Sequence, residues 1–173
     1  SLAGIYLLLQ AEFIGMVQAA VNHQLGRAEF EDLIGRGARM LHGNSLSDLD
    51  ELGERLFIQH IKKRIYPEMR ELVRAHQARG HTVVLSSSAL TVQVEPVANF
   101  LGIKNVLCNK FETDENGLIT GEVVTPVLWG PGKANAAQHF AANNGVDLAK
   151  SYFYADGDED VALMYLVGNP RPT

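Results

Sequence analysis

Side chains that could bind a phosphate group and a metal ion recur in the second half of the sequence. In chain order they are three hydroxyls, one lysine and two aspartates: Ser86, Ser87, Ser88, Lys133, Asp156 and Asp160. Carboxylate oxygens suit a hard cation such as Mg²⁺, and a lysine with nearby hydroxyls suits an anion. Together such a set can neutralise and orient a phosphoryl group beside a metal ion.

The two aspartates flank the end of a predicted strand. Residues 152–154 are an aromatic run typical of a buried strand, and Gly157 permits a tight turn after it. Asp156 is therefore predicted at the carboxyl end of this strand. Asp160 is predicted in the first turn of a helix that continues as VALMYLV. Acidic residues also favour helix N-termini, so a purely structural role is the alternative to metal binding.

The hydroxyl cluster ends the apolar segment HTVVL, which has the β-branched composition of a buried strand. A serine between a strand and a helix can present its hydroxyl and nearby backbone N–H groups to an anion. An ordinary polar strand end is the alternative.

Lys133 opens a predicted helix directly after Gly130, Pro131 and Gly132. A cation at this end of a helix is disfavoured by the macrodipole, so the lysine is expected to bind a phosphate or to pair with a carboxylate. A Walker phosphate loop is excluded, because Val127 stands where its first glycine belongs and Ala134 replaces the Ser or Thr.

The elements that must position these groups form two regions. Residues 1–65 contain three apolar stripes at helical spacing, which predict a small helical bundle. The first stripe includes Ile5, Leu8 and Phe13 and ends at Gly26, and the second runs from Phe30 to Leu41. Ser47 is predicted to begin the third helix, with Asp50 completing an approximate capping box.

Residues 66–173 alternate between helical and strand patterns. The predicted order is a helix from Pro67, the strand HTVVLSSS, a helix at 91–101, a strand at 105–108, a hairpin at 111–126, a helix at 132–144 and a strand at 151–155. This order predicts an α/β fold with a Rossmann-like parallel sheet flanked by helices. Right-handed crossovers would bring the hydroxyl cluster and Asp156 to one edge, where open α/β sheets bind ligands.

Composition limits the function classes further. A chain of 173 residues suits one domain with a small subdomain, and its formal charge of −5 disfavours a nucleic-acid surface. Cys108 is the sole cysteine, which excludes an internal disulfide and fits a cytoplasmic location. The apolar stretch at 5–9 is too short to span a membrane. The six histidines show no spacing that indicates a metal site.

The ordered motifs resemble the haloacid dehalogenase superfamily, in its phosphoserine-phosphatase-like branch. The second motif of that family, a Ser or Thr that ends an apolar strand, matches HTVVLSSS at Ser87. The third, a lysine that opens a helix, matches GPGK at Lys133, and the fourth matches DGDED at Asp156 and Asp160. The resemblance covers residues 60–173 well. It covers the helical part in outline, as a cap inserted after the first strand.

The resemblance implies a Mg²⁺-dependent phosphomonoester hydrolase that acts on a small phosphorylated metabolite through an aspartyl-phosphate. Ser87 and Ser88 would bind the phosphoryl oxygens, and Lys133 would offset the charge on the phosphate and the nucleophile. Asp156 would ligate Mg²⁺, and Asp160 would position Lys133 or the waters of the metal. The helical cap would close over the site and choose the substrate.

The sequence departs from this family in three places. Members carry an Asp-x-Asp-x-Thr nucleophile motif on a first strand, and nothing here matches it. The pair Asp48 and Asp50 is predicted to be helix N-terminal charge instead. The chain as given is therefore expected to begin inside the cap and to be inactive by itself. Ser88 stands where Gly or Ala is common, which is expected to narrow the phosphate pocket. Glu159 stands where phosphoserine phosphatases usually carry Asn, which argues against phosphoserine as the substrate.

Two other functions remain open at this point. One is a non-catalytic phosphate-binding, metal-binding or regulatory module of a larger acyltransferase of phospholipid synthesis, because close relatives of this kind occur fused to such a domain, which could hold the protein at a membrane. The other is a signalling receiver. It fits less well, because receivers carry their acidic pair early and their lysine last.

Overall fold

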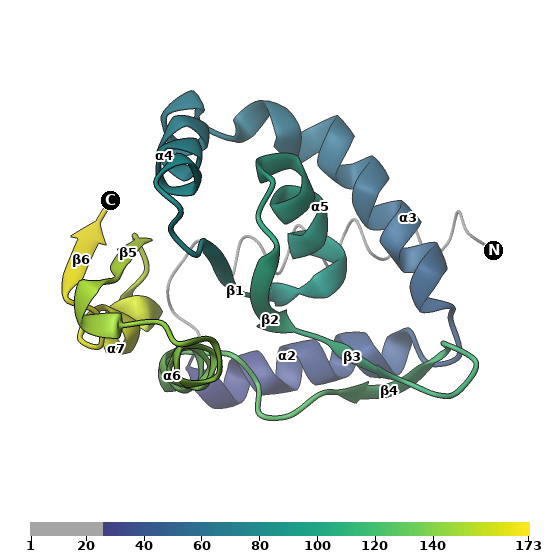
Figure 1. Ribbon diagram of the computed structural model, residues 1–173. Coiled ribbons are helices and arrows are strands. Elements are labelled where there is room, and N and C mark those ends of the chain that lie inside the picture. Colours follow the sequence, from purple (N-terminus) through teal and green to yellow (C-terminus); the bar gives the residue numbers. More distant parts are fainter. Residues whose placement is uncertain (1–25) are drawn as a thin grey trace.

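The computed structural model describes residues 26–173 and has a mixed α/β architecture, in which helices surround short strands (Figure 1). The first predicted helix, with Ile5, Leu8 and Phe13, lies outside the described residues. Among residues 26–173, no helix is both long and apolar enough to cross a bilayer.

The described part of the cap begins with α2 (Arg27–Met40) and α3 (Leu46–Leu56). The short helical turns η1 (Phe57–Ile61) and η2 (Lys62–Arg64) follow. α2 lies along the hairpin strand β4 (Ile119–Val123) and buries Phe30, Ile34 and Ala38 (Figure 1). α3 packs on α5 (Thr91–Leu101).

The predicted start of α3 was wrong by two residues. Its N-cap is Ser45, not Ser47, and the expected capping box with Asp50 does not form. The hydroxyls of Ser45 and Ser47 hydrogen-bond to each other instead, at 2.7 Å. Asp48 lies in the first turn of α3, where its charge favours the helix N-terminus as predicted.

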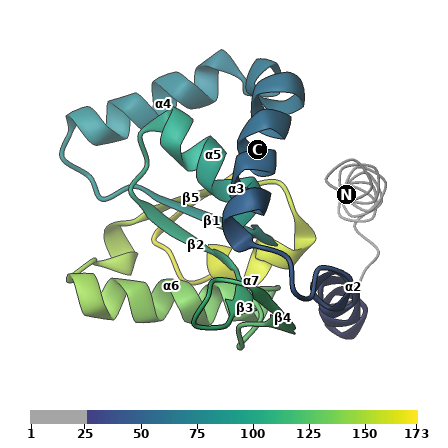
Figure 2. The same ribbon diagram turned by 90° about the vertical axis from the view of Figure 1, so that its right-hand side faces the viewer.

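The core follows the predicted order. Its elements are α4 (Pro67–Ala78), β1 (Val84–Leu90), α5, β2 (Asn105–Asn109), β3 (Phe111–Thr113), β4, α6 (Pro131–Asn144), η3 (Leu148–Lys150), β5 (Tyr152–Ala155), η4 (Asp158–Asp160), α7 (Val161–Met164) and β6 (Asn169–Pro172). α5 and α6 cover opposite faces of β1 and β2 (Figure 2). The proposed domain boundary after residue 65 falls between η2 and α4. It stays a prediction.

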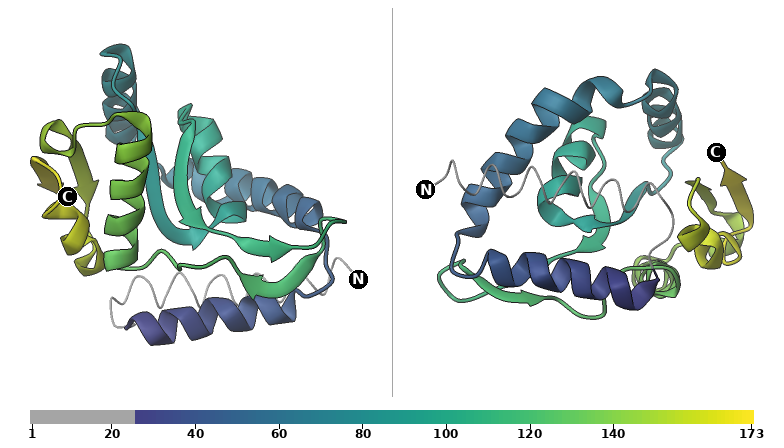
Figure 3. Two further views of the ribbon diagram at one scale, coloured as in Figure 1. Left: turned by 60° about the horizontal axis from the view of Figure 1, so that its bottom comes forward. Right: turned by 180° about the vertical axis from the view of Figure 1, so that it is seen from behind.

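Parallel pairing occurs in two separate pairs of strands. β1 pairs with β2, from Val84 opposite Asn105, and β5 pairs with β6, from Tyr152 opposite Asn169. Among the described strands, β1 has no hydrogen-bonded partner on its other side, and neither has β5. α6 lies next to both pairs in the left view of Figure 3, and it contacts both β1 and α7. The predicted parallel strands are therefore present, but they do not form one continuous sheet.

The hairpin joins the cap to the core. β3 and β4 are antiparallel, and the turn between them contains Gly117 at φ 75°, a left-handed conformation that favours glycine. Ile119 and Val123 point inward and join a single hydrophobic cluster with Phe30 and Leu49 of the cap. The cap therefore shares its apolar core with the hairpin.

The C-terminal segment differs from the prediction. α7 ends at Met164, although the pattern VALMYLV predicted a longer helix, and the chain then turns back to form β6 beside β5. Sequence patterns missed β6 because Pro170 and Pro172 normally argue against a strand. Proline lacks an N–H to donate, but it is tolerated on an edge strand such as this one.

Alanine substitutions at Gly53 of α3 and Gly37 of α2 test how closely α3 approaches α5. A Cβ on Gly53 would lie 2.1 Å from the carbonyl oxygen of Val92, whereas a Cβ on Gly37 would meet nothing within 4 Å. We expect Gly53→Ala to lower the free energy of unfolding by roughly 1–3 kcal/mol. Gly37→Ala, the matched control, should raise it by about 0.5–1 kcal/mol. Urea unfolding of both variants measures this, and equal effects would contradict the close crossing.

Candidate functional site

The six residues selected from the sequence line one pocket of about 450 Å³. Ser86, Ser87 and Ser88 reach it from the middle of β1, which continues to Leu90 beyond the predicted strand end. Lys133 reaches it from the start of α6, and Asp156 and Asp160 from the segment after β5. The cap contributes Phe30, Leu33 and Ile61 to the same pocket. The predicted convergence of these groups is therefore present in the structure, and their chemical roles stay predictions.

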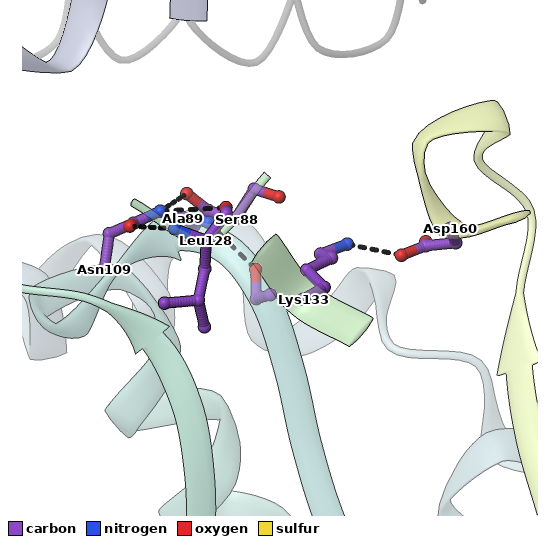
Figure 4. Close-up of polar contacts among 7 residues, drawn as sticks. Ser88, Ala89, Asn109, Leu128, Lys133 and Asp160 are labelled. Carbon is purple, nitrogen blue, oxygen red and sulfur yellow. Dashed lines mark hydrogen bonds and ion pairs between the residues drawn. The ribbon is translucent and has the colours of Figure 1, made fainter. Parts of the chain in front are cut away.

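Lys133 and Asp160 form a buried ion pair at the centre of this site (Figure 4). The Nζ of Lys133 donates to Oδ1 of Asp160 at 2.6 Å, and the two side chains are only 6% and 9% exposed. Burial of either charge without the other would be strongly unfavourable. The carboxylate thus explains how a lysine can stand at the positive end of α6.

The three serine hydroxyls of β1 differ in their hydrogen bonding. Ser86 Oγ and Ser88 Oγ are buried and have no hydrogen-bond partner among the described residues. Ser87 Oγ accepts a hydrogen bond from the backbone N–H of Ala89 at 3.1 Å, which leaves its own hydrogen free to donate elsewhere. Buried hydroxyls without partners are rare in folded proteins, and an anion with several acceptor oxygens would satisfy them.

Asn109 is a positioning residue that sequence patterns missed. Its side chain is almost fully buried at the end of β2. Its amide nitrogen donates to the carbonyls of Ser88, at 2.6 Å, and Leu128, at 3.2 Å, while its amide oxygen accepts from the N–H of Leu128 at 2.8 Å (Figure 4). It thereby ties the hydroxyl cluster to the loop that leads to Lys133. An asparagine at a strand end carries no spacing signal that could have revealed this.

Asp156 is the residue best placed to hold a metal ion. It is exposed, follows the last residue of β5 and faces the pocket beside Glu159. In the described part of the chain, no group of three or more His, Cys, Asp or Glu side chains is arranged to hold a metal. Mg²⁺ commonly keeps several waters and uses one or two carboxylates together with substrate phosphate. Asp156 could supply one carboxylate to such a site, and its role as a Mg²⁺ ligand stays a prediction.

An aromatic contact between cap and core was also missed. Phe30 of α2 stacks on Trp129, with ring centroids 4.4 Å apart and planes 21° apart. Trp129 directly precedes Gly130, the N-cap of α6. Both rings line the pocket, so this contact closes the pocket on the side of the cap.

A pair of histidines, His76 and His81, lies outside this pocket. The Nδ1 atoms of His76 and His81 are 2.8 Å apart, and His76 Nε2 is 3.2 Å from the hydroxyl of Tyr154. Their pairing could not be predicted from spacing, because the contact depends on the turn at Gly80 between α4 and β1. Burial lowers the pKa of His76, and the neighbouring His81 adds to this effect.

A model of the haloacid dehalogenase-like hydrolases matches residues 6–165, so the chain belongs to this family. It is 36% identical over 107 residues to the inhibition of morphological differentiation protein of Streptomyces azureus, covering 62% of this chain and 38% of that protein. It is 29% identical over 171 residues to phosphoserine phosphatase SerB1 of Mycobacterium tuberculosis, covering 96% of this chain and 55% of that one. The chain thus spans about half or less of the length of these two relatives.

The solved structures show the same fold. A phosphoserine phosphatase in the form of a phospho-aspartyl intermediate analogue matches with a TM-score of 0.66 and 20% identity, over 96% of this chain and 75% of that one. The resemblance inferred from the ordered motifs is confirmed by the family match, and the predicted fold class is confirmed by this structural match.

Substitutions at Lys133 and Asp160 should have strongly coupled effects on the free energy of unfolding. Lys133→Met leaves Asp160 buried without its partner, so we expect the free energy of unfolding to fall by about 3–5 kcal/mol. The double variant Lys133→Met/Asp160→Leu should recover most of that loss. Lys150 and Asp147 form an exposed pair at 3.4 Å, and Lys150→Met should cost at most about 1 kcal/mol. Additive effects at Lys133 and Asp160 in denaturant unfolding would contradict the coupling.

The lowered pKa of His76 sets the direction of a pH effect. The unfolded chain binds a proton at His76 near the ordinary value of 6.5, and the folded chain binds it less readily. Stability should therefore be fully present above about pH 6.5 and should decrease as the pH falls below it. His76→Gln should flatten this decrease. Thermal unfolding between pH 5 and pH 8 measures it, and an unchanged slope in the variant would disprove the contribution.

Proposed function

We propose that this protein is a Mg²⁺-dependent phosphomonoester hydrolase that acts through an aspartyl-phosphate intermediate. The observation that carries the proposal is the pocket in which a buried Lys133–Asp160 pair lies with the buried hydroxyls of Ser86 and Ser88. A lysine held by a carboxylate and hydroxyls without partners suit a phosphoryl group better than an uncharged ligand.

Each side chain then has a defined task. Ser87 and Ser88 donate hydrogen bonds to phosphoryl oxygens, and Lys133 offsets the negative charge that accumulates as the phosphorus is attacked. Asp160 holds the ammonium group of Lys133 in place. Asp156 supplies one ligand to Mg²⁺, which stabilises charge on the transferring phosphoryl group when bound. The stacked Phe30 and Trp129 exclude water from the cap side of the pocket.

The nucleophilic aspartate is proposed to lie on a strand between β1 and β5. These strands face each other across a second hollow of about 490 Å³, lined by Val84, Leu85 and Ser86 on one side and by Tyr152, Phe153 and Tyr154 on the other. A parallel strand in this slot would join the two strand pairs. Its carboxyl end would then emerge beside Ser86 and Asp156, within reach of a bound phosphate.

The named relatives support the reaction class. SerB1 and the structural match are both phosphoserine phosphatases, so we propose a small phosphorylated metabolite as the substrate. A cytoplasmic location is part of the same proposal. Neither relative reported above is named as an acyltransferase, and a fused acyltransferase domain stays a prediction from the sequence.

Asp156→Asn in the full-length natural protein tests this function. The substitution removes one charged ligand, so Mg²⁺-dependent hydrolysis should fall on the order of 100-fold, with the fold retained because Asp156 is exposed. Lys133→Ala should abolish most of the activity as well. Asp158→Asn is the matched control, because Asp158 is exposed in the same segment and does not line the pocket. Phosphate release from a panel of phosphomonoesters measures the effect.

Hydrolysis that survives both Asp156→Asn and Lys133→Ala would show that these roles are wrong. Phosphate binding without any turnover in the full-length protein would favour the other function, a non-catalytic binding or regulatory module.

A further inference from the structure

The lining of the phosphate pocket is divided by polarity. Its charged residues, Lys133, Asp156, Glu159 and Asp160, all come from α6 and the segment after β5. The cap, α5 and the loop before α6 contribute apolar side chains to the same lining: Phe30, Leu33, Ile61, Val94, Val97 and Trp129. Among the described residues, neither the cap nor α5 contributes a charged side chain to the lining.

Within residues 26–173, the cap and α5 add one polar side chain to the lining, Gln93, and only its amide oxygen is engaged. Gln93 lines the pocket, and its Oε1 accepts a hydrogen bond from the N–H of Leu90 at 3.0 Å at the start of α5. The arginines of α2 do not line the pocket. Arg27 pairs with Glu31 at 2.7 Å, and Arg36 pairs with Asp32 at 3.3 Å, all on an exposed face.

This distribution of charged and apolar side chains limits which leaving group of a phosphomonoester the pocket can accept. An amino-acid leaving group carries a carboxylate and an ammonium group, and burying both against hydrocarbon without partners is strongly unfavourable. An alkyl or aromatic group gains from the same surface. We propose that the substrate is a phosphomonoester whose leaving group is apolar where it meets the cap, and not a phosphorylated amino acid. This inference rests on the proposed phosphatase function.

Three phosphonates separate the phosphate from the leaving group, and their C–P bonds resist hydrolysis. Methylphosphonate probes the phosphate site alone, benzylphosphonate adds an aromatic ring, and 2-amino-4-phosphonobutyrate adds the amino-acid group of phosphoserine. Trp129 is the only tryptophan of the chain and lines the pocket, so its fluorescence should report binding in the presence of Mg²⁺. Calorimetry supplies the affinity if the fluorescence does not change.

We expect benzylphosphonate to bind at least tenfold more tightly than 2-amino-4-phosphonobutyrate, and also more tightly than methylphosphonate. Leu33→Gln should weaken benzylphosphonate about fivefold and leave methylphosphonate unchanged. Leu148→Gln is the matched control. Leu148 is also half-buried, but it lies in η3 and lines neither this pocket nor the hollow between β1 and β5, so binding of all three phosphonates should be unaffected.

The outcomes distinguish this inference from the proposed function. If methylphosphonate binds and 2-amino-4-phosphonobutyrate binds as tightly as benzylphosphonate or more tightly, the phosphate site stands and the apolar leaving group is wrong. Equal affinities for methylphosphonate and benzylphosphonate would overturn it too. If none of the three binds, the phosphate site itself is wrong, and the inference fails with it.

Discussion

The ion pair between Lys133 and Asp160 is the interaction on which the rest of the site depends. A lysine at the start of α6 faces the positive end of the helix dipole, and burial removes the water that would otherwise solvate its charge. Asp160 offsets both effects across 2.6 Å. The chain must therefore bring the segment after β5 against the start of α6, and this requirement fixes where Asp156 and the hydroxyls of β1 meet.

The phosphate side and the cap side of the pocket are held by different forces. Asn109 fixes the end of β1 to the loop before α6 with three hydrogen bonds, so the polar half is set by backbone geometry. The cap is held by apolar packing of α2 on the hairpin and by the stack of Phe30 on Trp129. The polar half is suited to bind the phosphoryl group that all substrates of such a site share. The apolar half is suited to bind the part of the substrate that varies.

Most of the order of helices and strands could be predicted, because glycines and prolines mark their ends and apolar periodicity marks their type. α5 has the predicted bounds, and Pro67 opens α4 as expected. Long-range contacts could not be predicted in the same way. Nothing in the sequence pattern indicated that Asn109 would hydrogen-bond to both Ser88 and Leu128. β6 was missed because its prolines argue against a strand. The site residues were found because their order matches a family, whereas Trp129 and Phe30 become site residues only once the cap is folded onto the core.

The division of the parallel strands into two pairs has a consequence for handling the protein. β1 and β5 each present one edge that no described strand covers, and unpaired N–H and C=O groups on such edges readily bind strands of other molecules. The described part of the chain thus carries two such edges, one on each side of the hollow between β1 and β5. Self-association, and therefore solubility, should then depend mainly on whether a strand pairs with these edges in the hollow between β1 and β5. Residues elsewhere on the surface should matter less.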